Sequence, residues 1–150
     1  MSYNTRDALD GYKQGIRSEV ETASPHRLIQ MLMQGALEKI AIAKGFMQQQ
    51  GVQAIAAKGE QITWAISIID GLKVSLDKST GGDIADNLES LYVYMIKRLM
   101  EANLHNKIEY LDEVAGLLKE IKSSWDAIPR DIIEEHAQKK ARENSKDSAA

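Results

Sequence analysis

The sequence predicts an all-α protein that folds as an antiparallel up-down four-helix bundle. Apolar residues recur at helical spacing between the two prolines, Pro25 and Pro129, and no segment keeps the alternation typical of strands. Short connections divide this region into four helical segments, and short connections make consecutive helices antiparallel neighbours. A chain of 150 residues is long enough for one domain with a single buried core.

The first helix is predicted to begin at Ser24 and Pro25. A serine hydroxyl accepts a hydrogen bond from a backbone N–H of the first turn, and proline suits the first helical position because no donor is needed there. We expect the helix to run to about Gln50 and to end at Gly51, a typical residue after a helix. Its central apolar stripe is Ile29, Leu32, Ala36, Ile40, Ala43 and Met47, flanked by Met31 and Ile42 on one side and by Met33 and Leu37 on the other.

The second helix is predicted from about Val52 to Asp77, and the third from an N-cap at Asp83. The turn between them, residues 78–82, contains two glycines that allow a positive φ. The predicted core stripe of the second helix is Ile55, Ile62, Ile66, Ile69 and Leu76. That of the third helix is Ile84, Leu88, Leu91, Met95, Leu99 and Ala102.

The fourth helix is predicted to begin at Asn106, with Glu109 completing a capping box, and to end before Pro129. Its apolar residues form one seam of Leu111, Val114, Leu118, Ile121, Trp125 and Ile128. The chain then divides into an N-terminal arm (1–23), the four-helix bundle (24–129) and a polar C-terminal tail (130–150). We expect the tail to fray from helix into disorder, since it is mostly polar.

The second and third helices carry more apolar residues than a bundle core requires. The predicted outward stripes are Trp64, Ile68 and Leu72 on the second helix, and Val93, Ile96, Met100 and Leu104 on the third. Such stripes predict a groove that accepts another amphipathic helix, and methionine suits a surface that adapts to its partner. The alternative is that the N-terminal arm (1–23) covers them. The arm could also do both, with Leu9, Tyr12, Ile16 and Val20 on part of the surface until a partner binds.

Composition argues against several other classes of function. The net charge of -3 gives no general reason to bind nucleic acid, and the absence of cysteine excludes thiolate catalysis. The three histidines, His26, His105 and His136, do not form a metal-ligand pattern, so we expect no catalytic, cofactor or metal site. No signal peptide or membrane-spanning run is visible, which predicts a cytoplasmic protein without membrane insertion.

Two alternative functions remain open from the residues alone. A four-helix bundle with an exposed histidine is compatible with a phosphotransfer signalling module, in which His105 would carry the phosphate. The context of His105, at a predicted turn between helices, argues against that role. In the other alternative, the second apolar stripes of two copies meet in a homo-oligomeric structural protein. An N-terminal arm exchanged between two copies would also give a dimer.

An ordered series of short motifs resembles the flagellin export chaperone family from about Tyr12 to Trp125. Tyr12 matches the N-terminal tyrosine of that family, and Ala23-Ser24-Pro25 matches its helix-start motif. Gly81-Gly82 followed by Leu91-Tyr92 matches its middle motif. The chain departs from the family pattern where an aromatic residue is common, at Met33, and where aspartate is common, at Val93.

The resemblance implies a cytoplasmic chaperone rather than an enzyme. Members of the family bind the C-terminal segment of flagellin, prevent its premature polymerisation and help to present it to the flagellar type III export gate. The implied partners are therefore flagellin and a component of the export gate. The implied state is a monomer or an arm-exchanged dimer without a cofactor.

Overall fold

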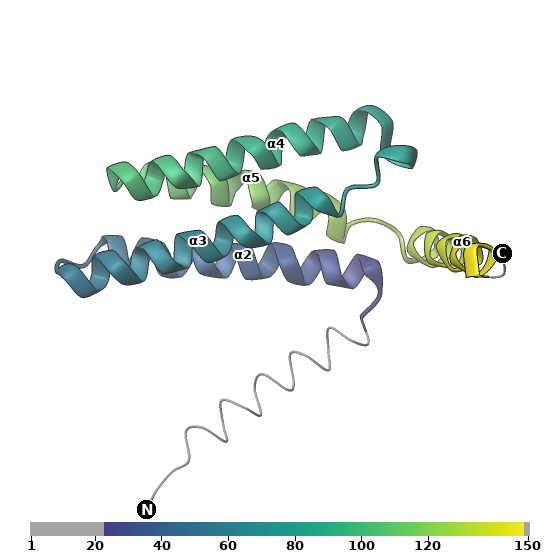
Figure 1. Ribbon diagram of the computed structural model, residues 1–150, viewed down its shortest axis with the longest axis horizontal. Coiled ribbons are helices and arrows are strands. Elements are labelled where there is room, and N and C mark those ends of the chain that lie inside the picture. Colours follow the sequence, from purple (N-terminus) through teal and green to yellow (C-terminus); the bar gives the residue numbers. More distant parts are fainter. Residues whose placement is uncertain (1–22, 149–150) are drawn as a thin grey trace, which may run out of the picture. The chain divides into compact units, whose positions relative to one another are not determined.

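The computed structural model describes residues 23–148 of the chain. The helices of this range are α2 (Pro25–Met47), α3 (Val52–Val74), α4 (Lys78–His105), α5 (Ile108–Asp126) and α6 (Arg130–Ser148). No β-strand occurs between residues 23 and 148, which confirms the all-α fold class. Residues 29–128 form one compact unit, which contains nearly all of α2 and the whole of α3, α4 and α5 (Figure 1).

Within this unit the four helices form the expected antiparallel bundle. Helix α3 packs against α4, and α4 packs against α5. Helices α2 and α5 are joined by an ion pair between Lys44 Nζ and Asp112 Oδ1 at 2.8 Å, and by a hydrogen bond from Gln30 Nε2 to Asp126 Oδ1 at 2.8 Å. The ion pair joins the end of α2 to the beginning of α5, and the hydrogen bond joins the beginning of α2 to the end of α5, as antiparallel helices require.

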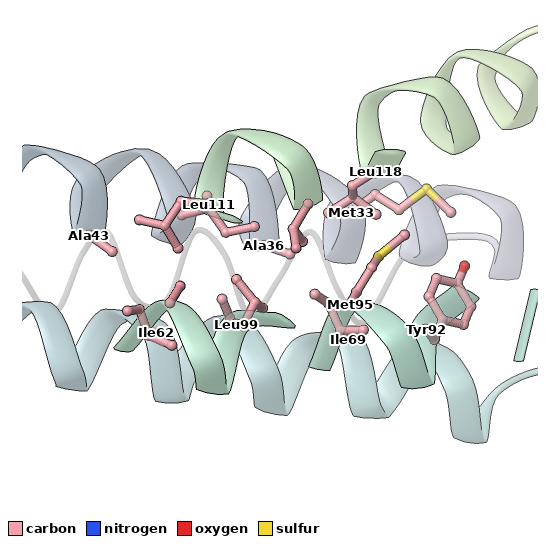
Figure 2. Close-up of a cluster of buried hydrophobic side chains, with 14 of the residues drawn as sticks. Met33, Ala36, Ala43, Ile62, Ile69, Tyr92, Met95, Leu99, Leu111 and Leu118 are labelled. Atoms are coloured by element: carbon pink, nitrogen blue, oxygen red, sulfur yellow. The ribbon is translucent and has the colours of Figure 1, made fainter. Parts of the chain in front are cut away.

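The core lies along the bundle axis, and all four helices contribute to it. Figure 2 shows side chains from α2 and α5 facing side chains from α3 and α4. Alanines at the helix contacts leave room for close packing of the larger aliphatic side chains. The buried cluster comprises Met33, Ala36, Ile40, Ala43, Met47, Ile62, Ala65, Ile69, Leu72, Tyr92, Met95, Leu99, Ala102, Leu111, Val114 and Leu118.

The predicted start of α2 is confirmed, but its predicted end is wrong. The Ser24 hydroxyl accepts a hydrogen bond from the Arg27 N–H at 3.1 Å, as expected for an N-cap. Helix α2 then ends at Met47, three residues before the predicted Gln50. Gly51 has a φ of 113° and is the N-cap of α3, so it begins the next helix rather than ending α2.

The positive φ predicted for the turn at residues 78–82 occurs at Gly82, but this residue is a break inside α4 rather than a turn before it, and the predicted N-cap is wrong. Gly82 has a φ of 51° and a ψ of -128°, a conformation that favours glycine. A helical turn already begins at Lys78, because the Asp77 carboxylate accepts a hydrogen bond from the Ser79 N–H at 3.1 Å. Asp83 is therefore not the first cap. Ile84, which was predicted to face the core, directly follows this break and is exposed.

The predicted capping box at Asn106 and Glu109 is also wrong. Asn106 has left-handed backbone angles and ends α4, and its N–H bonds back to the Ala102 carbonyl. Asparagine tolerates this conformation better than most residues, so it serves at a helix end as readily as at a helix start. Helix α5 begins after Lys107, without a hydrogen bond from a capping side chain, and ends at Asp126, before Pro129 as predicted.

The core face of α3 is rotated from its predicted position by less than one residue, since Ile62 and Ile69 belong to both the predicted and the observed stripe. The buried residues are Ala54, Lys58, Ile62, Ala65, Ile69 and Leu72. Ile55, predicted to lie in the core, is exposed, and Ile66 is only partly buried. Met33 of α2, predicted on a flank, is fully buried. Apolar residues surround most of α3, so periodicity alone did not determine which side faces the core.

The polar tail forms a regular helix, α6, where fraying was expected. It lies outside the unit that contains the bundle. Alanine, glutamate, lysine, arginine and glutamine favour helix without tertiary packing. Asp131 in the first turn and Lys146 in the last turn complement the helix dipole, and Arg130 pairs with Glu134 one turn away.

Candidate functional site

Four of the seven apolar residues predicted on the outward stripes are at least half exposed. Trp64 of α3 is 55% exposed, and on α4 Val93 is 50%, Met100 58% and Leu104 77% exposed. Their own helices bury the opposite side in the core, so exposure here is not a sign of poor packing. Exposed apolar side chains that cluster mark interaction surfaces more often than isolated ones do.

The other three residues of these stripes lie differently from the prediction. Leu72 is only 1% exposed and belongs to the core, so its assignment to an outward stripe is wrong. Its position follows from the rotation of the α3 core face described above. Ile68 and Ile96 are partly buried and pack against the core, so they line the edges of the exposed surface.

The exposed residues of α3 and α4 belong to two surfaces rather than one. The first, the α2–α3 surface, consists of Trp64 and Ile68 from α3 with Gly35, Lys39 and Ile42 from α2. The Lys39 ammonium lies 3.9 Å from the centre of the Trp64 ring, and a Cβ added to Gly35 would lie 3.6 Å from Ile68 Cδ1. The tryptophan side of α3 therefore faces α2.

The second, the α4 surface, consists of Val93, Ile96, Met100 and Leu104. The side of α3 nearest to α4 carries Lys58 and Gly59, which lie close to Asn103. Helical spacing places Trp64 on the other side of α3 from Gly59. A segment that contacts both surfaces must therefore cross or wrap α3 rather than lie in a single straight groove.

A hollow of about 530 Å³ opens at the end of the bundle, beside the turn between α2 and α3 and the end of α4. Its walls include the apolar side chains Phe46, Ile55 and Leu104. Lys58 also lines it and is only 6% exposed. The Lys58 ammonium donates hydrogen bonds to the Asn103 carbonyl at 3.1 Å and to Asn106 Oδ1 at 3.2 Å.

Sequence reasoning missed Lys58 because lysine is usually placed on a solvated face. Its position was nevertheless readable from the spacing, since it lies four residues from both Ala54 and Ile62 in the buried stripe of α3. A cation at the carboxyl end of a helix is favourable because the last carbonyl groups of α4 are exposed there. Lys58 therefore links the beginning of α3 to the end of α4 through hydrogen bonds.

A charged aromatic cluster lies between α4 and α5. Arg98 stacks over the Tyr110 ring at 3.7 Å and bonds to both Glu101 and Glu113. The Tyr94 hydroxyl donates a hydrogen bond to Glu113, which lowers the pKa of the Glu113 carboxyl and raises the pKa of Tyr94. These groups pair with one another and so stabilise the contact between α4 and α5.

The remaining predicted candidates do not come together in the described part of the chain. His105 is in the last turn of α4 and His136 is on α6, and neither belongs to a group of metal-ligating side chains in residues 23–148. No helix within this range is both long and apolar enough to cross a membrane. Leu9, Tyr12 and Ile16 of the N-terminal arm lie outside the described residues.

Comparison with known proteins then decides the family. Residues 8–131 match the model of the flagellar protein FliS family. This chain belongs to the FliS family. The match covers the whole bundle and ends at the beginning of α6, so the C-terminal helix lies almost entirely beyond the matched region.

Curated FliS proteins resemble the chain over most of both lengths. Flagellar secretion chaperone FliSB of Pseudomonas aeruginosa is 51% identical over 122 residues, which are 81% of this chain and 94% of that protein. Flagellar secretion chaperone FliS of Salmonella typhimurium is 46% identical, over 83% of this chain and 91% of its own. The FliS chaperone of Vibrio cholerae is 42% identical, over 83% and 90%.

Proposed function

We propose that this protein is a cytoplasmic flagellar secretion chaperone that binds the C-terminal segment of flagellin. Binding would prevent premature polymerisation of flagellin and keep it ready for type III export. Membership of the FliS family supports the chaperone role. The observation that carries the binding role is the exposure of Trp64, Val93 and Met100 on helices whose opposite faces are buried.

The two surfaces suit a flexible client better than a rigid one. They lie on different sides of α3, so a segment that folds as it binds can follow them while a straight preformed helix contacts only one. Coupled folding and binding typically buries about 1,000–3,000 Å² and loses several kcal/mol to ordering. This cost limits affinity, and an export chaperone must finally release its client.

The edge residues and the N-terminal arm also have roles in client binding. Ile68 and Ile96 line the client-binding surfaces, and Leu104 extends the α4 surface to the end of the bundle. Leu9, Tyr12 and Ile16 would cover part of these surfaces until a client arrives. A component of the flagellar export gate is the second partner, and the free protein is a monomer or an arm-exchanged dimer.

Oxidation of methionine by dilute peroxide tests the α4 surface within one protein. Exposed Met100 is expected to oxidise readily in the free protein and to become protected at least several-fold when flagellin binds. Met33 and Met95 are internal controls, since both are buried in the core and oxidise slowly in either state. Peptide mass spectrometry gives the rate at each methionine. Equal oxidation of Met100 with and without bound flagellin would exclude the α4 surface.

The same experiment distinguishes the chaperone function from that of a self-associating structural protein. If the α4 surface instead joins two copies of this chain, Met100 protection will rise with protein concentration when flagellin is absent. Sedimentation equilibrium of the free protein over the same concentrations supplies the matching measure of mass.

A further inference from the structure

The hollow at the end of the bundle combines features that attract an anion with apolar walls. Lys58 is the one charged side chain among the described residues that line it. Phe46, Ile55 and Leu104 line the same hollow with apolar groups. Binding sites of this kind use a few placed polar groups to orient a ligand and apolar walls to hold it.

The positive charge of Lys58 is not balanced by a carboxylate within the described chain. None of the ion pairs between residues 23 and 148 includes Lys58, and its two hydrogen-bond acceptors are the Asn103 carbonyl and the amide oxygen of Asn106. The carboxyl end of α4 offers only about half a negative charge. An ammonium has three N–H donors, so one donor remains for a ligand.

The beginning of α3 adds donors to the same hollow. Gly51 is its N-cap and offers no side-chain hydrogen bond, and the first turn contains no acidic residue. The first N–H groups of a helix lack partners within the helix and carry partial positive charge. Gly51 and Ala54 of this region both line the hollow. The helix end thus reinforces the charge of Lys58.

We propose that this hollow binds the terminal α-carboxylate of the client, an assignment that rests on the proposed function. Leu104 belongs to both the α4 surface and the wall of the hollow, so the two sites are continuous. A C-terminal segment that lies along α4 reaches Lys58 where the bundle ends. Its last apolar side chain packs between Ile55 and Leu104, and its carboxylate accepts hydrogen bonds from the Lys58 ammonium.

The test compares two synthetic peptides that span the C-terminal segment of the bacterium's own flagellin, one ending in a free acid and the other in an amide. Fluorescence anisotropy with the full-length protein gives both dissociation constants. We expect the acid to bind about tenfold more tightly, as is typical for loss of one charge-assisted hydrogen bond. Equal affinities of the acid and the amide would overturn the proposal without involving any variant.

Two variants test whether Lys58 is the group that binds the carboxylate. In K58M, a methionine of similar length fills the same space, and we expect the acid and the amide to bind equally. K119M removes one charge from the exposed surface of α5 and should keep the tenfold difference. If K58M also keeps it, Lys58 is not the carboxylate partner and the proposal fails.

A third peptide tests whether a side-chain carboxylate of the client, rather than its terminal carboxylate, binds in the hollow. Replacing the acidic side chains of the amide peptide by their amides should leave its affinity unchanged if the terminal carboxylate is the ligand. A loss of affinity that requires Lys58 would show that a side-chain carboxylate occupies the hollow instead, against the proposal. Failure of all peptides to bind would contradict the proposed function itself.

Discussion

Replacing Met100 with glutamate is expected to weaken flagellin binding by about 30-fold or more, the effect of losing about 2 kcal/mol at a binding hot spot. Met100 is 58% exposed in the free protein, so the new carboxylate remains hydrated there. In the complex it would be buried against an apolar client, at a large desolvation cost. The free energy of unfolding should change by less than about 0.5 kcal/mol, as for most surface substitutions.

The matched control for this prediction adds the same charge to a different face. Ser124 is exposed on α5 and belongs to neither the α2–α3 surface nor the α4 surface, so Ser124→Glu should leave the affinity for flagellin unchanged. Calorimetric titration measures affinity, and urea unfolding measures stability. Unchanged affinity of Met100→Glu, with both proteins folded, would remove Met100 from the binding surface.

Truncation of Leu99 to alanine should have the largest effect on stability. Leu99 is fully buried in the centre of the α4 core face, between Met95 and Ala102. Removing its side chain leaves a cavity and is expected to lower the free energy of unfolding by about 2–5 kcal/mol. This is a large part of the about 5–15 kcal/mol that stabilises a typical domain.

Leu104→Ala is the matched control, because it removes the same side chain from an exposed position of the same helix. Leu104 is 77% exposed, so Leu104→Ala should change the free energy of unfolding by less than about 0.5 kcal/mol. Urea denaturation followed by circular dichroism compares the two variants with the parent protein. Similar losses for Leu99→Ala and Leu104→Ala would mean that the α4 core face is assigned incorrectly.

Helix boundaries could be predicted from the sequence where a residue suits only one position in a helix. Ser24 followed by Pro25 favours a helix start and little else, and α2 begins there. Gly51 and Asn106 are suited to either side of a helix boundary, since both tolerate positive φ. Their placement depended on how neighbouring helices meet, which is a property of the folded bundle rather than of the local sequence.

The functional surface was only partly readable for a related reason. In α5 a single apolar seam fixed the core face, and Leu111, Val114 and Leu118 are buried as predicted. In α3, apolar residues lie on several sides, so Leu72 was assigned to the outside although it belongs to the core. Trp64, Val93, Met100 and Leu104 are exposed as expected, but their separation into two surfaces depends on the packing of α2 and α4 around α3.

We propose that the exposed apolar residues of this bundle bind the C-terminal segment of flagellin. Calorimetric titration with whole flagellin and with flagellin lacking that segment tests it most directly. We expect a one-to-one complex with whole flagellin, a negative heat-capacity change from apolar burial, and no measurable binding after truncation. Equal binding of the whole and truncated proteins would contradict it.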